Sequence, residues 1–164
     1  MSMISELSFF LGFQVKQMKE GVFISQGKYT QDLLKRFKMV DSKPIKTPMA
    51  SNGNLDLDEG GNLIDKTLYR SMIGSLLYLT ASRPDIMFTV CMCSRYQAMP
   101  MESHVIAVKS ILRCLKYTPY LGLWYPKGTR LQLVGNSDSD YAGCRIDTKS
   151  TSKGCHFLGR SLVS

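Results

Sequence analysis

Two aspartates are the acids whose type and spacing could hold a metal ion. Asp138 and Asp140 lie in the run Gly135-Asn136-Ser137-Asp138-Ser139-Asp140-Tyr141, directly after an apolar stretch that predicts a strand. Residues two apart on a strand face the same side, so both carboxylates could approach one Mg²⁺ ion. Two-metal phosphoryl chemistry needs several carboxylates around ions about 3.5–4 Å apart, and the sequence offers this one local pair. The Asn-Ser-Asp-Ser-Asp composition also favours a polar turn, and that alternative stays open.

Two predicted helical stretches, residues 29–38 and 109–117, contain both basic and aromatic residues. Cations at this spacing can follow the phosphates of a nucleic acid, and aromatic rings can stack on its bases. The cations predicted to contact nucleic acid are Lys35, Arg36, Lys109, Arg113 and Lys116. The competing interpretation is the solvated face of an ordinary amphipathic helix, and the sequence does not separate the two.

The histidines and cysteines follow no pattern typical of a metal site or of a nucleophile. We expect His104 and His156 to be structural or solvated. The five cysteines have irregular spacing, and Cys91-x-Cys93 has no second pair at zinc-site spacing. We therefore predict free thiols in a reducing, intracellular compartment, with cytoplasm and nucleus unresolved.

Composition bounds the class of protein. The chain has 164 residues, of which 44% are hydrophobic and 21% charged, which is the range of a globular protein with a core. No apolar run approaches the roughly 20 residues of a membrane span, so we expect no membrane partner. A net charge of +8 favours a polyanionic partner. The charge is uneven, because residues 69–135 hold eight bases and two acids whereas residues 51–68 hold four acids and one base.

The hydrophobic pattern predicts a strand-rich start followed by helices. Two apolar runs around Met18-Lys19-Glu20-Gly21 predict a hairpin, and residues 29–39 predict a helix. The Gly, Asn and Asp residues of 51–65 indicate a long solvated loop. Three helices should follow, over residues 67–81, over residues 86–97 and from an N-cap at Ser103, with a break at Ser82-Arg83-Pro84-Asp85.

From Tyr120 the pattern changes to the alternation typical of strands. Leu121, Leu123 and Tyr125 alternate, and a turn signal at Pro126-Lys127-Gly128 separates them from a second run at residues 131–135. Residues 156–158 predict a third short strand. Three strands without a covering helix leave one sheet face exposed, which we interpret as the start of an unfinished domain. The predicted fold class is α+β.

A series of short motifs occurs in a fixed order along the chain. They are Phe9-Phe10-Leu11-Gly12-Phe13, Gly21-Val22-Phe23-Ile24-Ser25-Gln26, Pro44-Ile45-Lys46-Thr47-Pro48-Met49, Tyr69-Arg70-Ser71-Met72-Ile73-Gly74-Ser75-Leu76-Leu77-Tyr78-Leu79, Arg83-Pro84-Asp85-Ile86, Gly122-Leu123-Trp124-Tyr125 and Ser137-Asp138-Ser139-Asp140-Tyr141-Ala142-Gly143. In this order the chain resembles, over essentially its whole length, the Pol polyprotein of Ty1/copia-type LTR retrotransposons.

The resemblance implies an assignment for each part of the chain. Residues 1–50 resemble the end of the reverse-transcriptase palm, as a hairpin and a helix, and residues 51–66 form an acidic linker. Residues 67–118 resemble thumb or connection helices that hold a template–primer duplex. Residues 119–164 resemble the opening of a ribonuclease H domain with a truncated sheet. By this match Asp138 is the family's first metal-binding carboxylate, and Mg²⁺ is the cofactor of the intact parent.

Departures from the family pattern shape the functional expectation. The paired aspartates of the polymerase should lie upstream and the later ribonuclease H carboxylates downstream. Asn136 stands where the family has an aromatic residue, and Lys153 where it has glycine. We expect a Pol fragment without a complete active site, without a cofactor or small-molecule substrate of its own, and with the remainder of Pol as a partner. The alternatives are a non-catalytic basic module that binds RNA–DNA or other nucleic acid, and an inert or poorly folded remnant.

Overall fold

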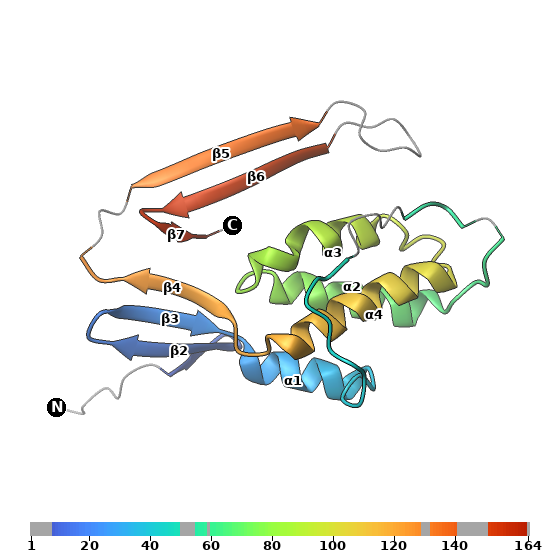
Figure 1. The fold of residues 1–164 in the computed structure, drawn as a ribbon, viewed down its shortest axis with the longest axis horizontal. Coiled ribbons are helices and arrows are strands. Elements are labelled where there is room, and N and C mark those ends of the chain that lie inside the picture. Colours follow the sequence, from blue (N-terminus) through green and yellow to red (C-terminus); the bar gives the residue numbers. More distant parts are fainter. Residues whose placement is uncertain (1–7, 50–54, 59, 129–131, 141–150, 164) are drawn as a thin grey trace. The chain divides into compact units, whose positions relative to one another are not determined.

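The computed structural model describes residues 8–49, 55–58, 60–128, 132–140 and 151–163, with the side chains of residues 140 and 151–153 excepted (Figure 1). These residues form helices and two antiparallel sheets, so the α+β class is confirmed. The chain divides into two compact units. One, the helical unit, is residues 27–121; the other, the sheet unit, combines residues 1–26 with residues 122–164.

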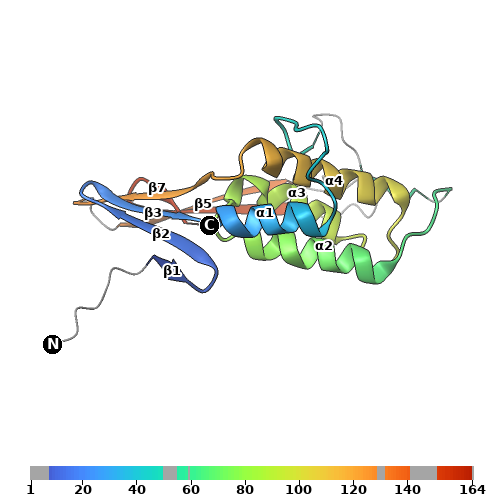
Figure 2. The same cartoon turned by 90° about the horizontal axis from the view of Figure 1, so that it is seen from below.

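The helical unit is built from four α-helices and one short 3₁₀ helix. Their bounds are α1 Gly27–Arg36, α2 Lys66–Leu79, η1 Pro84–Ile86, α3 Met87–Ser94 and α4 Glu102–Tyr117. The helix α1 packs on α2 and α4, and α3 packs between the same two partners (Figure 2). Each predicted helix exists, and the predicted ends differ from the observed ones by up to three residues.

One hydrophobic cluster holds the helical unit together. Its buried members come from all four α-helices, from η1 and from the turn that follows α1, and they are Leu33, Leu34, Met39, Tyr69, Met72, Ile73, Leu76, Leu79, Ile86, Val90, Cys93, Val105, Val108, Ile111, Leu112 and Leu115. The spacing of three and four along each helix places these side chains on one face, which is why the helices pack face to face. Burial of this apolar surface is the main force that stabilises the unit.

The first turns of α2 and α4 are capped in different ways. Asp65 caps α2, since its Oδ1 accepts a hydrogen bond of 2.8 Å from the backbone N–H of Thr67. The predicted cap of α4 is wrong: Met101 is the N-cap, and the Ser103 hydroxyl has no partner among the described residues. Instead the Nδ1 atom of His104 accepts a hydrogen bond of 2.9 Å from the backbone N–H of Met101.

A buried arginine closes the corner between α2 and α3. Arg83 is only 2% exposed and binds Asp85 through two hydrogen bonds of 2.8 Å. It also donates to the backbone carbonyl of Thr118 at 2.8 Å and to the Thr118 hydroxyl at 2.9 Å. Thr118 is the C-cap of α4, so Arg83 satisfies a carbonyl that the end of that helix leaves unpaired. The sequence indicated only a break at this position. In the structure, Arg83 links the corner between α2 and α3 to the end of α4.

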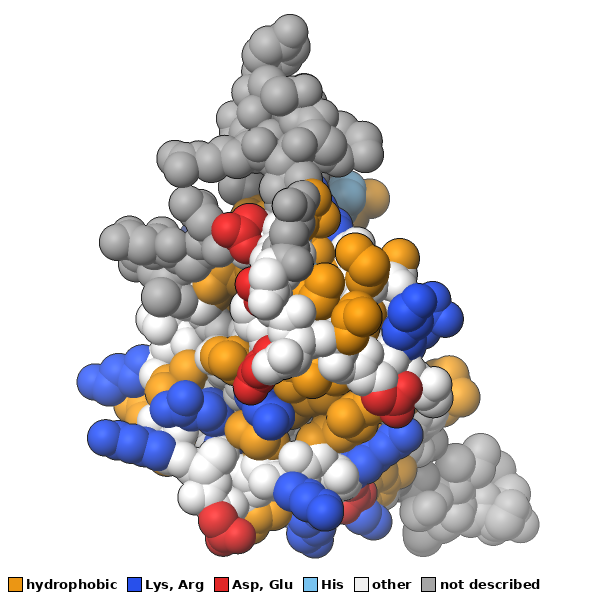
Figure 3. Space-filling model, turned by 90° about the vertical axis from the view of Figure 1, so that its right-hand side faces the viewer, with side chains coloured by type: hydrophobic (Ala, Val, Ile, Leu, Met, Phe, Trp, Pro, Cys, Tyr) orange, Lys and Arg blue, Asp and Glu red, His pale blue; other side chains and the backbone are white. Residues whose placement is uncertain are grey.

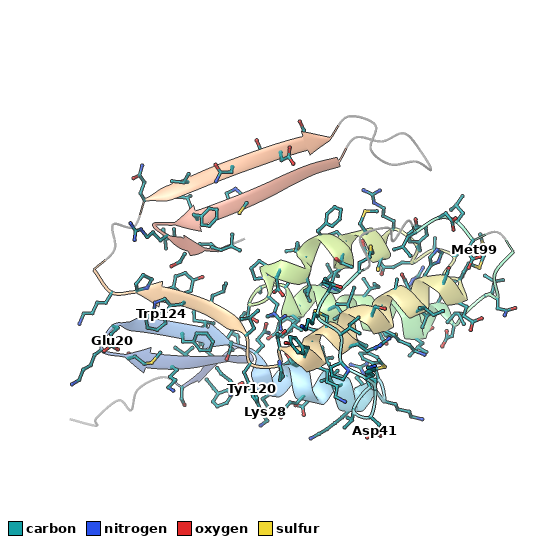
Figure 4. All side chains as sticks on the ribbon, viewed as in Figure 1. Glu20, Lys28, Asp41, Met99, Tyr120 and Trp124 are labelled. Carbon is teal, nitrogen blue, oxygen red and sulfur yellow. The ribbon has the colours of Figure 1, made fainter. Side chains whose placement is uncertain are left out.

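The first sheet has the strand order β1-β2-β3-β4, with β1 Phe9–Phe10, β2 Phe13–Met18, β3 Gly21–Ser25 and β4 Gly122–Pro126. The predicted hairpin is confirmed, because β2 and β3 pair across the turn that contains Glu20 (Figure 4). The strand β4 pairs with β3. The turn signal at residues 126–128 therefore follows a strand of the first sheet, and the next strand along the chain belongs to the second sheet.

Glycines permit the close approach of β3 and β4. A Cβ atom on Gly21 would lie 2.3 Å from the carbonyl oxygen of Tyr125, and one on Gly122 would lie 2.2 Å from that of Ile24. Both distances are far inside van der Waals contact, so any larger residue would push the strands apart. The two glycines stand at opposite ends of the ladder, in the pairs Gly21 with Pro126 and Gly122 with Ser25.

The second sheet has the order β5-β6-β7, with β5 Leu133–Asp140, β6 Thr151–Leu158 and β7 Ser161–Leu162. The polar run 136–140 lies within β5, so the polar-turn alternative is wrong. Every side chain described on β5 is exposed. A hydrogen bond of 2.7 Å from the Ser161 hydroxyl to the carbonyl of Trp124 joins β7 to β4. None of the described helices is long and apolar enough to cross a membrane.

Candidate functional site

An open groove in the helical unit gathers basic residues around an apolar floor. Its volume is about 520 Å³, within the range of ligand sites in proteins. We call it the basic groove, and it is lined by Arg36, Phe37, Lys38, Met39, Ile64, Leu68, Met72, Val105 and Lys109. No acid stands among these lining residues. Lys and Arg side chains lie among hydrophobic ones on the face shown in Figure 3.

The end of α1 places two of the cations in the basic groove. The backbone N–H of Met39 donates to the carbonyl of Leu34 at 2.8 Å, and that of Lys38 donates to Lys35 at 3.1 Å. These two bonds define a Schellman turn, whose left-handed position glycine usually occupies. Here Lys38 holds that position, with a φ of 55°. A side chain with a Cβ is strained there by about 1–2 kcal/mol, so the turn keeps a charge at a cost in stability.

The charges of the basic groove have no ion-pair partner among the residues that the structure describes. Among the residues that the structure describes, no carboxylate forms an ion pair with Arg36, Lys38 or Lys109. The guanidinium carbon of Arg36 lies 5.3 Å from the ring centroid of Phe37, a cation–π contact that holds the charge beside the groove. Exposed, unpaired cations around an apolar surface can bind an anion that also carries an apolar part.

Arg113 and Lys116 have partners inside the protein. The Nε of Arg113 donates to the carbonyl of Lys43 at 2.7 Å, and the Nζ of Lys116 donates to those of Ser42, at 2.7 Å, and Val40. Both residues thus fasten the loop after α1 to α4. Of the five cations predicted to contact nucleic acid, two have this structural role, and Arg36 and Lys109 line the basic groove.

Lys35 and Lys38 depart from the sequence-based prediction in opposite ways. Lys35 is exposed in the last turn of α1, where a cation also stabilises the helix dipole, and it does not line the basic groove. Lys38 does line the groove, although the sequence did not single it out. The predicted helix ran to residue 39, which hid the turn, and the absence of glycine after α1 removed the usual signal.

Asp138 lies on β5 with an exposed side chain and pairs in register with Lys153. Asp140 is the last residue of the same strand, two positions on, and its side chain is outside the described set. No group of three or more His, Cys, Asp and Glu side chains suited to a metal ion occurs in the described part of the chain. Asp138 by itself does not supply the several oxygen ligands that Mg²⁺ takes from a protein site.

His104 is a structural residue, as expected. Its ring is fully buried and stacks on Tyr96, with ring centroids 3.9 Å apart. Because Nδ1 accepts from Met101, Nε2 carries the proton and donates to the carbonyl of Asp56 at 2.8 Å. The Tyr96 hydroxyl donates to the neighbouring carbonyl of Leu55 at 2.7 Å. This part of the acidic loop is therefore held against the helices, where the sequence indicated a solvated stretch.

The buried thiols and one buried phenol are kept neutral. Burial raises the pKa of the Cys93 thiol to about 12, and burial also raises the pKa of the Cys114 thiol, against a smaller lowering by Arg83. Burial raises the pKa of Tyr69 as well, whose hydroxyl donates to the carbonyl of Cys93 at 2.7 Å. Cys91, Cys93, Cys114 and Cys155 are all free thiols. Raised pKa values make Cys93 and Cys114 poor nucleophiles, in keeping with a packing role.

Comparison with known proteins finds relatives over nearly the whole chain. The retrovirus-related Pol polyproteins from transposons RE1 and RE2 of Arabidopsis thaliana are 43% and 42% identical to it, each over 97% of the chain. The chain spans only 11% of the length of either polyprotein. An uncharacterized mitochondrial protein of the same plant is 34% identical over 98% of the chain and 67% of its own length. Neither a protein-family model nor a solved structure matches.

Proposed function

Because the chain belongs to the retrovirus-related Pol polyproteins of Ty1/copia-type retrotransposons, we propose that its helical unit contacts the template–primer duplex as part of a reverse transcriptase. Residues 67–118 then serve as thumb or connection helices between the end of the palm and the opening of a ribonuclease H domain. The observation that carries this proposal is the charge of Arg36, Lys38 and Lys109 at the basic groove, with which no described carboxylate forms an ion pair.

Phosphate contacts explain this arrangement better than a merely solvated helix face. A solvated face needs no particular backbone conformation, whereas Lys38 occupies a left-handed position that glycine would fill without strain. Strain of this kind persists where the surrounding structure holds it, and it is often found at functional sites. Lys35 is exposed one turn away and adds to the same positive field.

We also propose that this chain by itself lacks two activities of the intact Pol polyprotein. Asp138 and Asp140 belong, in the proposal, to a Mg²⁺ site of a longer, intracellular Pol, and the 164-residue chain has neither polymerase nor ribonuclease H turnover. The support is that Asp138 is exposed on β5 and belongs to no group of three or more His, Cys, Asp and Glu side chains within the described part of the chain. Primer extension by the purified chain in the presence of Mg²⁺ or Mn²⁺ would contradict this assignment.

A salt titration of binding to an RNA–DNA duplex tests the proposed contact. We expect a Kd of order 10⁻⁴–10⁻⁶ M at physiological salt, with log affinity falling linearly as log salt rises. Lys109→Gln should weaken binding, because one phosphate contact is lost. The slope of log affinity against log salt should then fall in magnitude by about one. Lys66→Gln is the matched control, since Lys66 is exposed on α2 and does not line the basic groove. Binding that does not respond to salt would reject the proposal.

Lys38→Gly should change binding and stability in opposite directions. The substitution relieves the left-handed strain, so we expect the free energy of unfolding to rise by about 1 kcal/mol. It also removes a cation, so the same variant should bind the duplex more weakly and with a smaller salt slope. A variant that is more stable and binds as well as the parent chain would exclude Lys38 from the interface.

A further inference from the structure

The basic groove has more apolar surface than phosphate contacts require. Phosphate groups are bound by charges and N–H donors, which can stand on a flat surface. Here Phe37, Met39, Ile64, Leu68, Met72 and Val105 form a concave floor beneath the cations. Met39 and Met72 are 6% and 2% exposed and continue into the hydrophobic core, whereas Leu68 is 46% exposed. The floor is therefore rigid on one side and offers an accessible leucine on the other.

The cations reach the groove from two separate elements. Arg36 and Lys38 come from the end of α1, and Lys109 comes from α4. A nucleotide within a strand has its base between two phosphates, so a strand that crosses the groove could place one base on the floor with a phosphate toward each group of cations. A ligand with a single charged end, such as a fatty acid, would leave one group unused.

The side chains of the floor limit how a base could contact it. The floor contains apolar side chains and no polar neutral one, so it cannot satisfy the hydrogen-bonding edge of a base. That edge can stay in water, which an open groove allows and a closed pocket would not. Contact through the face of the base alone is tolerant of sequence, as in other sites for single-stranded nucleic acid.

We propose that the basic groove binds one unpaired nucleotide of a nucleic-acid strand, with its base on the apolar floor and its flanking phosphates on Arg36, Lys38 and Lys109. This inference rests on the proposed function and adds a preference for an unpaired base, which duplex contact does not require.

The test compares two single strands of equal charge. One is a short oligothymidylate, and the other is an abasic strand of the same length, which keeps the phosphates and lacks the bases. We expect the full chain to bind the oligothymidylate roughly tenfold more tightly, the order of magnitude that one base contact supplies. Leu68→Ala should reduce this ratio toward one and leave the affinity for the abasic strand unchanged. Lys109→Gln should weaken binding of both strands.

Leu77→Ala is the matched control for Leu68→Ala. Leu77 lies on the same helix and is 40% exposed, but it does not line the basic groove. We expect its removal to leave both affinities unchanged. A comparison of thermal unfolding curves checks that both variants fold like the parent chain, which their exposure predicts.

The outcomes separate this inference from the proposed function. Equal, salt-dependent affinity for the two strands overturns the nucleotide site and leaves duplex contact in place. A loss with Leu77→Ala as large as that with Leu68→Ala also overturns it, because the base would then lie elsewhere. Binding of an acidic, leucine-containing peptide in place of oligothymidylate would assign the groove to a protein partner. Absence of binding to any nucleic acid rejects both proposals.

Discussion

The two units of this chain differ in how far each is stabilised by its own residues. The helical unit contains every buried hydrophobic side chain of the described residues, and most of these side chains form one cluster. In the sheet unit the described strands form antiparallel pairs, yet their apolar side chains stay half-buried or exposed, and Val134 is 41% exposed. Backbone pairing alone thus organises strands without excluding water from them. The free energy of folding should therefore reside mainly in the helices.

The largest expected effect comes from a core residue of the helical unit. Leu76→Ala removes a fully buried side chain and should lower the free energy of unfolding by about 2–5 kcal/mol. Val134→Ala shortens an exposed side chain on β5 and should change it by less than about 0.5 kcal/mol. Urea unfolding of both variants, followed by circular dichroism of the helices, measures the difference. Equal losses would show that the sheet unit has a core of its own.

Arg83 should come next in size. Arg83→Met keeps an unbranched side chain but leaves the Thr118 carbonyl and hydroxyl and the Asp85 carboxylate without their donor. We expect a loss of about 1–3 kcal/mol, the usual cost of a buried polar group left unpaired. Arg83→Lys keeps the charge but not the planar fork, so its loss should be partial. Arg95→Met, at an exposed position after α3, is the control for removing a charge.

The last effect is a pH dependence of the helical unit, which is absent at neutral pH and small just above pH 9. The folded pKa of Cys93 rises from 9.0 to about 12, so between these values the folded state holds a proton that the unfolded state has lost. Stability should therefore fall as the pH rises above 9, by at most about 1.4 kcal/mol per pH unit for each such group. The raised pKa of Tyr69 acts in the same direction.

Cys93→Ala should reduce the slope of stability against pH above 9. The control is Cys91→Ala, because Cys91 lies in the same helix with an exposed thiol. Thermal unfolding at several alkaline pH values gives the slope for each variant. An unchanged slope in Cys93→Ala would mean that another group titrates in this range.

Local patterns were enough to predict the helices and the first hairpin. Helices α2 and α4 repeat apolar residues at three and four, and this periodicity by itself selects a helix with one buried face. Their ends were less accurate, since Ser103 looked like a cap and His104 makes the capping contact. A histidine rarely performs this task, so composition gave little signal for it.

The sequence by itself determined the elements, the α+β class, the uneven charge and the resemblance that the comparison with Pol polyproteins bears out. Only the tertiary structure decided how the cations are used. Arg113 and Lys116 share a helix with Lys109, but the loop at residues 40–46 covers them and leaves Lys109 exposed. Likewise the pairing of β4 with β3 joins segments about a hundred residues apart. Such contacts depend on which surfaces meet after folding, and local sequence patterns do not encode that.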